Sequence, residues 1–73
     1  MQSAEYLVVL AVVGRARGRE RERMYHALRD RPRAEVDAAI ESLEREGVIV
    51  VKGVRVHASP ALKRLHELGL IGI

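Results

Sequence analysis

The stretch AEVDAAIESLEREGVI, residues 34–49, decides the fold of this 73-residue chain. Apolar residues recur in it at the i, i+4 and i+7 spacing of one α-helix face, with an alanine alongside: Val36, Ile40 and Leu43, with Ala39. Pro32 suits the first turn of this helix, and Gly47 suits the position just after its last turn. The pattern predicts a helix over residues 32–46 with one face packed against a core.

The residues after this helix predict a tight β-hairpin and a further helix. Two β-branched runs, residues 48–51 and 54–57, flank the pair Lys52–Gly53, which favours a two-residue turn. Ser59 is a suitable N-cap, with a proline directly after it, for a helix over residues 60–68. The leucines of that helix are expected to face inward: Leu62, Leu65 and Leu68.

Two helices are expected before residue 32. Ser3 is a suitable N-cap for a helix over residues 4–13. This segment is apolar on every side and is expected to be buried all round, although its valines also suit a buried strand. A loop with a glycine at each end, residues 14–18, separates it from a second helix over residues 19–29. The second helix has an apolar stripe with a tyrosine at its margin: Met24, Ala27 and Leu28, with Tyr25.

The order helix, helix, turn, helix, hairpin, helix resembles the winged helix-turn-helix arrangement. The resemblance lies in residues 24–28, in the break at residues 30–32 and in residues 34–49, which look like the recognition helix of small MarR-like and archaeal regulators running into a wing. It spans about residues 4–68 and implies a mainly α fold with a small β-hairpin, in one domain over residues 1–73. It also implies double-stranded DNA as the partner, with the third helix in the major groove, the preceding turn on phosphates and the wing near the minor groove.

Charge is distributed unevenly along the chain, whose net charge is +3 and whose pI is about 10.0. Residues 15–33 hold eight arginines against three carboxylates, a net charge of +5. Residues 34–47 hold five carboxylates against one arginine, a net charge of −4. The basic block therefore favours an anionic partner. The abundance of Arg and Glu without cysteine is compatible with a thermophilic source or with a GC-rich genome, and the lack of cysteine fits a reducing compartment.

Several function classes are not expected from this composition. The longest apolar run, residues 6–13, has eight residues, whereas a membrane span needs about 20, so a cytoplasmic protein without a membrane segment is expected. The three histidines lack metal-ligand spacing, and no Ser/His/Asp set or phosphate-binding loop is visible. The chain is therefore expected to be a binding module without metal or cofactor, and not an enzyme.

The candidate DNA-contacting residues belong to the loops, the wing and the third helix. Phosphate contacts are expected from the cations Arg15, Arg17, Arg19, Arg31, Arg33, Lys52 and Arg55. Base contacts are expected from the outward side of the third helix: Ala34, Glu35, Ala38, Ser42 and Arg45. A solvated surface is the alternative, since Arg19–Glu22 and Glu20–Arg23 are i,i+3 pairs that would partly neutralise each other.

The apolar ends of the chain predict self-association. A small monomer has little interior to cover both the first helix and the apolar tail at residues 69–73, so a homodimer is expected. Its expected interface is Tyr6, Leu7, Leu10, Leu62, Leu65, Leu70, Ile71 and Ile73. The alternative is that the tail folds back onto its own first helix. The acidic third helix, short wing and apolar ends also suit a rival function, a winged-helix module that binds a protein partner within a nucleic-acid-processing complex.

Overall fold

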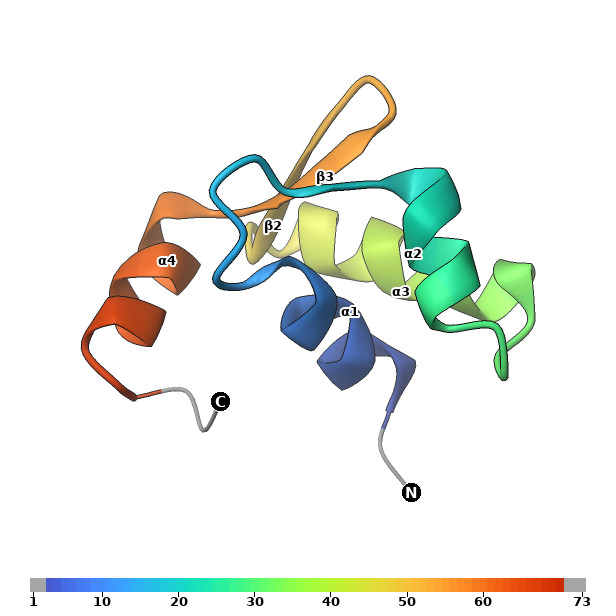
Figure 1. The fold of residues 1–73 in the computed structure, drawn as a ribbon, viewed down its shortest axis with the longest axis horizontal. Helices are drawn as coiled ribbons and strands as arrows, with labels where there is room; N and C mark the ends of the chain where they lie inside the picture. Colours follow the sequence, from blue (N-terminus) through green and yellow to red (C-terminus); the bar gives the residue numbers. More distant parts are fainter. Residues whose placement is uncertain (1–2, 71–73) are drawn as a thin grey trace.

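The computed structural model describes residues 3–70, which form four helices and a three-stranded antiparallel sheet (Figure 1). The elements run in the order α1 (Ala4–Val12), β1 (Arg19–Glu20), α2 (Arg21–Ala27), α3 (Arg33–Arg45), β2 (Ile49–Lys52), β3 (Arg55–Ala58) and α4 (Pro60–Glu67). The core lies between α1, α2, α3 and the sheet, while α4 stands at the end of the fold away from α2 (Figure 1). No helix within residues 3–70 is long and apolar enough to cross a membrane.

Helix α3 follows the pattern that predicted it. Its apolar face is buried at all four expected positions: Val36, Ala39, Ile40 and Leu43. Gly47, at φ +79°, reverses the chain, and its N–H donates to the Glu44 carbonyl at 3.0 Å. The Val48 N–H donates to the Leu43 carbonyl at 2.9 Å, which completes a Schellman motif. The predicted inward face and the predicted glycine stop are both confirmed.

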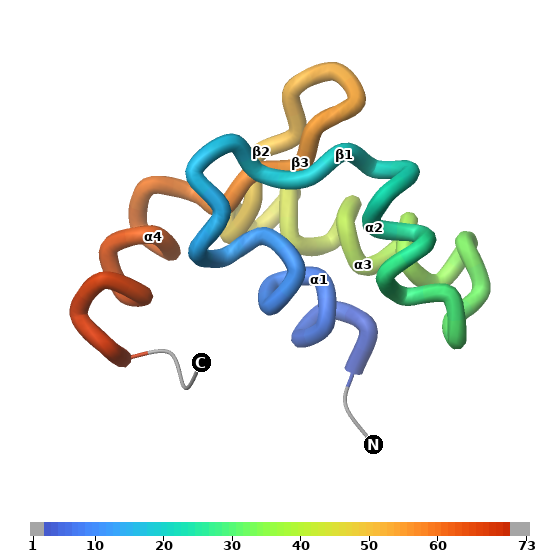
Figure 2. Tube along the Cα trace, in the orientation of Figure 1, coloured from blue at the N-terminus to red at the C-terminus, as the bar shows by residue number. Residues whose placement is uncertain are grey.

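The sheet contains the predicted hairpin and one strand that the sequence did not predict. Strands β2 and β3 pair with Lys52 opposite Arg55, so the turn is Gly53–Val54, one residue later than predicted. Gly53 has φ +60° at the first loop position, which matches a type II′ turn. Strand β1 pairs with the other edge of β3, giving the order β1-β3-β2 (Figure 2). The expected mainly α fold is therefore corrected to a mixed α/β layout.

The second predicted helix, residues 19–29, is shorter at both ends. Its first two residues form β1 because they pair with β3, and α2 then ends at Ala27. Within the predicted stripe, Met24 and Leu28 are buried but Ala27 is exposed. The start of α2 is therefore set by sheet pairing and not by the apolar spacing of its own residues.

Helix α1 packs on α3 through one face only. The Oγ of Ser3 accepts a hydrogen bond from the Tyr6 N–H at 3.1 Å, as the predicted N-cap requires. Val8 and Val12 are fully buried, whereas Tyr6, on the opposite side, is 42% exposed. The prediction that this helix is buried all round is wrong within the described chain, because the other elements cover only the side that faces the core.

Helix α4 joins the core through its first turn. The Oγ of Ser59 accepts from the Leu62 N–H at 3.1 Å, and Leu62 is buried. Leu65 and Leu68 are 43% and 54% exposed. The predicted inward leucine face is therefore wrong beyond Leu62 within the described residues, because α4 lies at the end of the fold and packs there mainly against β3 (Figure 1).

Candidate nucleic-acid interface

The turn between α2 and α3 presents the two arginines expected to grip phosphates, and both lie against carboxylates. Arg31 Nη1 is 2.9 Å from Glu35 Oε2. Arg33 Nη2 is 3.2 Å from Glu22 Oε2, and its guanidinium lies 4.6 Å from the centroid of the Tyr25 ring. Exposed ion pairs of this kind are weak, but each neutralises part of the charge that a phosphate would meet. The attraction of these two arginines for DNA phosphates is therefore weaker than expected.

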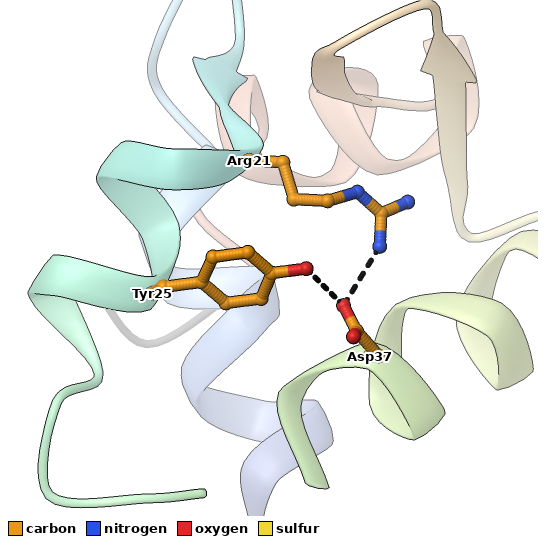
Figure 3. Close-up of polar contacts among 3 residues, drawn as sticks. All are labelled: Arg21, Tyr25 and Asp37. Atoms are coloured by element: carbon orange, nitrogen blue, oxygen red, sulfur yellow. Dashed lines mark hydrogen bonds and ion pairs between the residues drawn. The ribbon is translucent and has the colours of Figure 1, made fainter. Parts of the chain in front are cut away.

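A polar cluster joins α2 to α3 (Figure 3). Asp37 Oδ1 accepts hydrogen bonds from the Tyr25 hydroxyl and from Arg21 Nη1, the latter at 2.9 Å. The Tyr25 hydrogen bond holds the pKa of Asp37 below its usual range, and the Arg21 charge adds to the effect. Burial raises the pKa of Tyr25, and its hydrogen bond to Asp37 acts in the same direction. The cluster links α2 to α3 and engages Arg21 within the chain.

The outward side of α3 is exposed only in part. Ala34, Ala38 and Arg45 are exposed as predicted, and Ser42 is half-buried. Ala38 and Ser42 lie along a shallow hollow that they share with the start of α1, where the neighbouring residues are Ser3, Ala4 and Glu5. Four exposed carboxylates lie beside this side of α3 or at its C-terminal end: Glu35, Glu41, Glu44 and Glu46. The predicted base-reading surface therefore combines small side chains with negative charge.

The β2–β3 hairpin carries little unpaired positive charge that could contact DNA. Arg55 Nη2 lies 3.6 Å from Glu20 Oε1, and Arg55 Nη1 donates to the Arg17 carbonyl at 3.1 Å. Arg55 therefore connects β3 to β1 and to the preceding loop, and does not reach outward from the tip. The tip is the Gly53–Val54 turn, and Val54 is 70% exposed. Lys52 is exposed beside that turn.

An open hollow of about 740 Å³ lies where the α1–β1 loop, β1 and α2 meet. We call it the arginine hollow; its lining is Arg15, Gly18, Arg19, Glu20, Glu22, Arg23, His26, Ala27 and Arg55. Within residues 3–70, no carboxylate ion pair is found for Arg15, Arg19 or Arg23. Burial lowers the pKa of the Arg19 guanidinium, and repulsion from Arg15 and Arg23 lowers it further. Arg19 therefore lies close enough to Arg15 and to Arg23 to be repelled by both.

Each carboxylate of the hollow forms an ion pair with an arginine other than Arg15, Arg19 and Arg23. Glu20 pairs with Arg55 and Glu22 pairs with Arg33. The expected i,i+3 pairs Arg19–Glu22 and Glu20–Arg23 do not form, because residues 19 and 20 belong to a strand and not to the first turn of a helix. Arg23 was left out of the expected phosphate contacts because helical spacing paired it with Glu20, although it belongs to the alternating arginines of residues 15–23. Arg17 is exposed but is not among the residues that line the hollow.

The expected dimer surface is exposed at some of its residues. Leu65 is 43% exposed, Leu70 is 70% exposed, and Tyr6 is exposed on α1. Leu7 and Leu10 are half-buried, and Leu62 is buried within its own chain. Ile71 and Ile73 lie outside the described residues.

Comparison of the chain with protein-family models, with curated proteins and with solved structures gives no match. Within the part of the chain that the structure describes, no group of three or more His, Asp or Glu residues could hold a metal ion. The candidate site therefore rests on the geometry and charge of the surface itself.

Proposed function

We propose that this chain is a small winged-helix protein that binds double-stranded DNA and acts as a dimeric transcriptional regulator. One observation carries the proposal: most of the basic block of residues 15–33 keeps its charge available after folding. Its internal ion pairs with carboxylates involve Arg21, Arg31 and Arg33. No carboxylate pair within residues 3–70 is found for its five other arginines: Arg15, Arg17, Arg19, Arg23 and Arg29. A surface with such uncompensated guanidiniums attracts the phosphate backbone of a duplex.

The element order supports the winged-helix assignment. Two helices joined by a short turn, α2 and α3, are followed directly by the β2–β3 hairpin and then by α4. The Arg21–Asp37–Tyr25 cluster links the two helices by hydrogen bonds, which favours one arrangement of the pair for docking on DNA (Figure 3).

The test of the proposal is a titration of a fluorescently labelled random-sequence duplex with the purified protein, followed by anisotropy at several salt concentrations. Saturable binding that weakens steeply with salt is expected, because the affinity comes from displaced counterions. A protein with no duplex binding at low salt would exclude the proposal.

The dimer belongs to the proposal and is supported by exposed apolar side chains on α1 and α4. Tyr6, Leu65 and Leu68 are each more than 40% exposed, which is unfavourable for a monomer in water. Analytical ultracentrifugation at micromolar concentration is expected to give a dimer, and the variant Leu65→Glu/Leu68→Glu is expected to give a monomer of unchanged helix content. A monomeric wild-type protein would contradict this part of the proposal.

A second function, a winged-helix module that binds another protein, is favoured by the exposed carboxylates of α3. Glu41 and Glu44 are exposed and would lie close to phosphates if α3 entered a DNA groove. A stoichiometric protein partner recovered by affinity purification, together with no duplex binding at low salt, would select this function over the first.

A further inference from the structure

We infer that the arginine hollow, and not the outward side of α3, is the surface on which the phosphate backbone of a DNA duplex docks. The inference rests on the proposed function and specifies its binding surface. It reverses the expectation that α3 carries the recognition residues. Since the hollow would contact phosphates and not base edges, it would supply affinity and position the chain on the duplex, but it would not discriminate between sequences.

Three arginines from three separate parts of the chain line this hollow. Arg15 comes from the α1–β1 loop, Arg19 from β1 and Arg23 from the first turn of α2. Figure 2 shows the loop and β1 running beside β3 and leading directly into α2. The convergence of these elements places three cations around one concavity, a shape that suits a convex, negatively charged backbone.

The backbone beneath the hollow is held in place. β1 pairs with β3 through Arg19 opposite Val56, and Arg55 donates to the Arg17 carbonyl at 3.1 Å. At Gly18 the loop passes so close to β3 that an added Cβ would lie 2.3 Å from the Val56 carbonyl oxygen. The cations are therefore carried by an ordered platform, and little chain entropy needs to be lost when a phosphate binds.

The charges around the hollow favour an anion. Both of its carboxylates, Glu20 and Glu22, already face other arginines at 3.6 Å and 3.2 Å. The repulsion between Arg19 and its two cationic neighbours is a cost that the folded chain bears without a ligand. A phosphate oxygen placed among the three guanidiniums would turn that repulsion into attraction.

The outward side of α3 is mainly negative, unlike the arginine hollow. Its exposed cation is Arg45, and this stands among the exposed carboxylates Glu41, Glu44 and Glu46. Insertion of the helix into the major groove would bring these carboxylates towards the phosphates that line the groove. Binding through the hollow avoids this contact.

The experiment compares two double variants that remove the same charge from different places. Arg19→Ala/Arg23→Ala removes two cations from the hollow, and Lys63→Ala/Arg64→Ala removes two exposed cations from α4. At about 0.1 M monovalent salt, loss of two phosphate contacts is expected to weaken duplex binding about 60-fold and to reduce the log–log salt slope by about 1.8. The α4 variant is expected to change affinity by no more than about threefold, because it only lowers the long-range field.

Further variants keep the test decisive. Arg15→Ala lies in an exposed loop, so it preserves the fold even if the double variant does not, and it is expected to weaken binding about 8-fold at the same salt. Ala34→Glu and Arg45→Ala lie on the exposed side of α3 and are expected to leave binding within about threefold of the wild type.

The outcomes separate the inference from the function on which it rests. If the wild-type chain binds duplexes but the hollow variants match the α4 control, while the α3 variants lose binding, the inference is wrong and the proposed function stands. If the wild-type chain binds no duplex at low salt, both are wrong. Selective loss of binding in the hollow variants supports the inference.

Discussion

Gly18 makes the closest backbone approach among the described glycines, and its replacement by alanine gives the sharpest test of the platform beneath the hollow. Its φ is +66°, a conformation that favours glycine. An alanine Cβ would lie 2.3 Å from the Val56 carbonyl oxygen and 2.8 Å from His57 Nδ1. The imidazole could rotate away, but the carbonyl belongs to β3, which is paired on both edges.

The expected cost combines two effects that a matched control separates. Gly47 also has a positive φ, +79°, but a Cβ there would meet nothing within 4 Å. Gly47→Ala should therefore cost only the left-handed backbone penalty, about 1–2 kcal/mol. Gly18→Ala should add the cost of forcing an atom into occupied space, about 1–3 kcal/mol more.

Urea denaturation followed by far-UV circular dichroism measures both costs in the free energy of unfolding. Thermal unfolding gives a second measure, since 1 kcal/mol corresponds to about 4–8 °C in a domain of this size. The reasoning would be refuted if Gly18→Ala were no less stable than Gly47→Ala, because β3 would then yield without cost.

Three further predictions concern the core, a helix cap and the polar cluster. Ile40→Ala should lower the free energy of unfolding by about 2–5 kcal/mol, whereas Val54→Ala, at the exposed turn, should change it by less than about 0.5 kcal/mol; equal losses in urea denaturation would contradict the assigned core. Ser59→Ala should cost about 0.5–2 kcal/mol, and no loss of thermal stability would mean that this cap contributes nothing. Asp37→Asn should be less stable than the wild type at pH 7. Because the folded pKa of Asp37 is lowered, chiefly by Tyr25, its stabilisation is complete above the unfolded value of about 3.9 and is lost as the pH falls through the folded value. Thermal unfolding between pH 7 and pH 2 should therefore show the stability of the wild type and of Asp37→Asn becoming more similar in acid. A stability difference between the two proteins that does not change with pH would contradict the lowered pKa of Asp37.

The sequence predicted the elements whose signals are local. Helix α3 was predicted because its apolar residues repeat at helical spacing and Gly47 stops it. The hairpin was predicted from β-branched runs around a glycine, and the one-residue error arose because Gly53 takes the first place of the turn and not the second.

The elements that depend on distant partners were missed. Strand β1 has two residues, too few for any periodic signal, and it exists because Arg19 and Glu20 pair with β3 much later in the chain. The exposure of Leu65 likewise depends on how few elements surround α4, which the spacing of its own leucines does not reveal.

The candidate site was predicted only in part, because it too depends on partners that are distant in the sequence. Arg15 and Arg19 were expected from the basic loop, but the charge state of the surface depends on which carboxylate each arginine meets. Glu22 pairs with Arg33 on another helix and Glu20 pairs with Arg55 on β3. The two i,i+3 pairs expected from helical spacing therefore do not form, and Arg19 and Arg23 keep their charge available.

The most direct test of the central claim, that this surface binds duplex phosphates, is the affinity of the wild-type chain for one random-sequence duplex at 50 mM and 200 mM salt. Three phosphate contacts predict a log–log slope of about −2.7, which is a loss of about 40-fold between those conditions. An affinity that is the same at both salt concentrations, or no saturable binding at the lower one, would contradict the account.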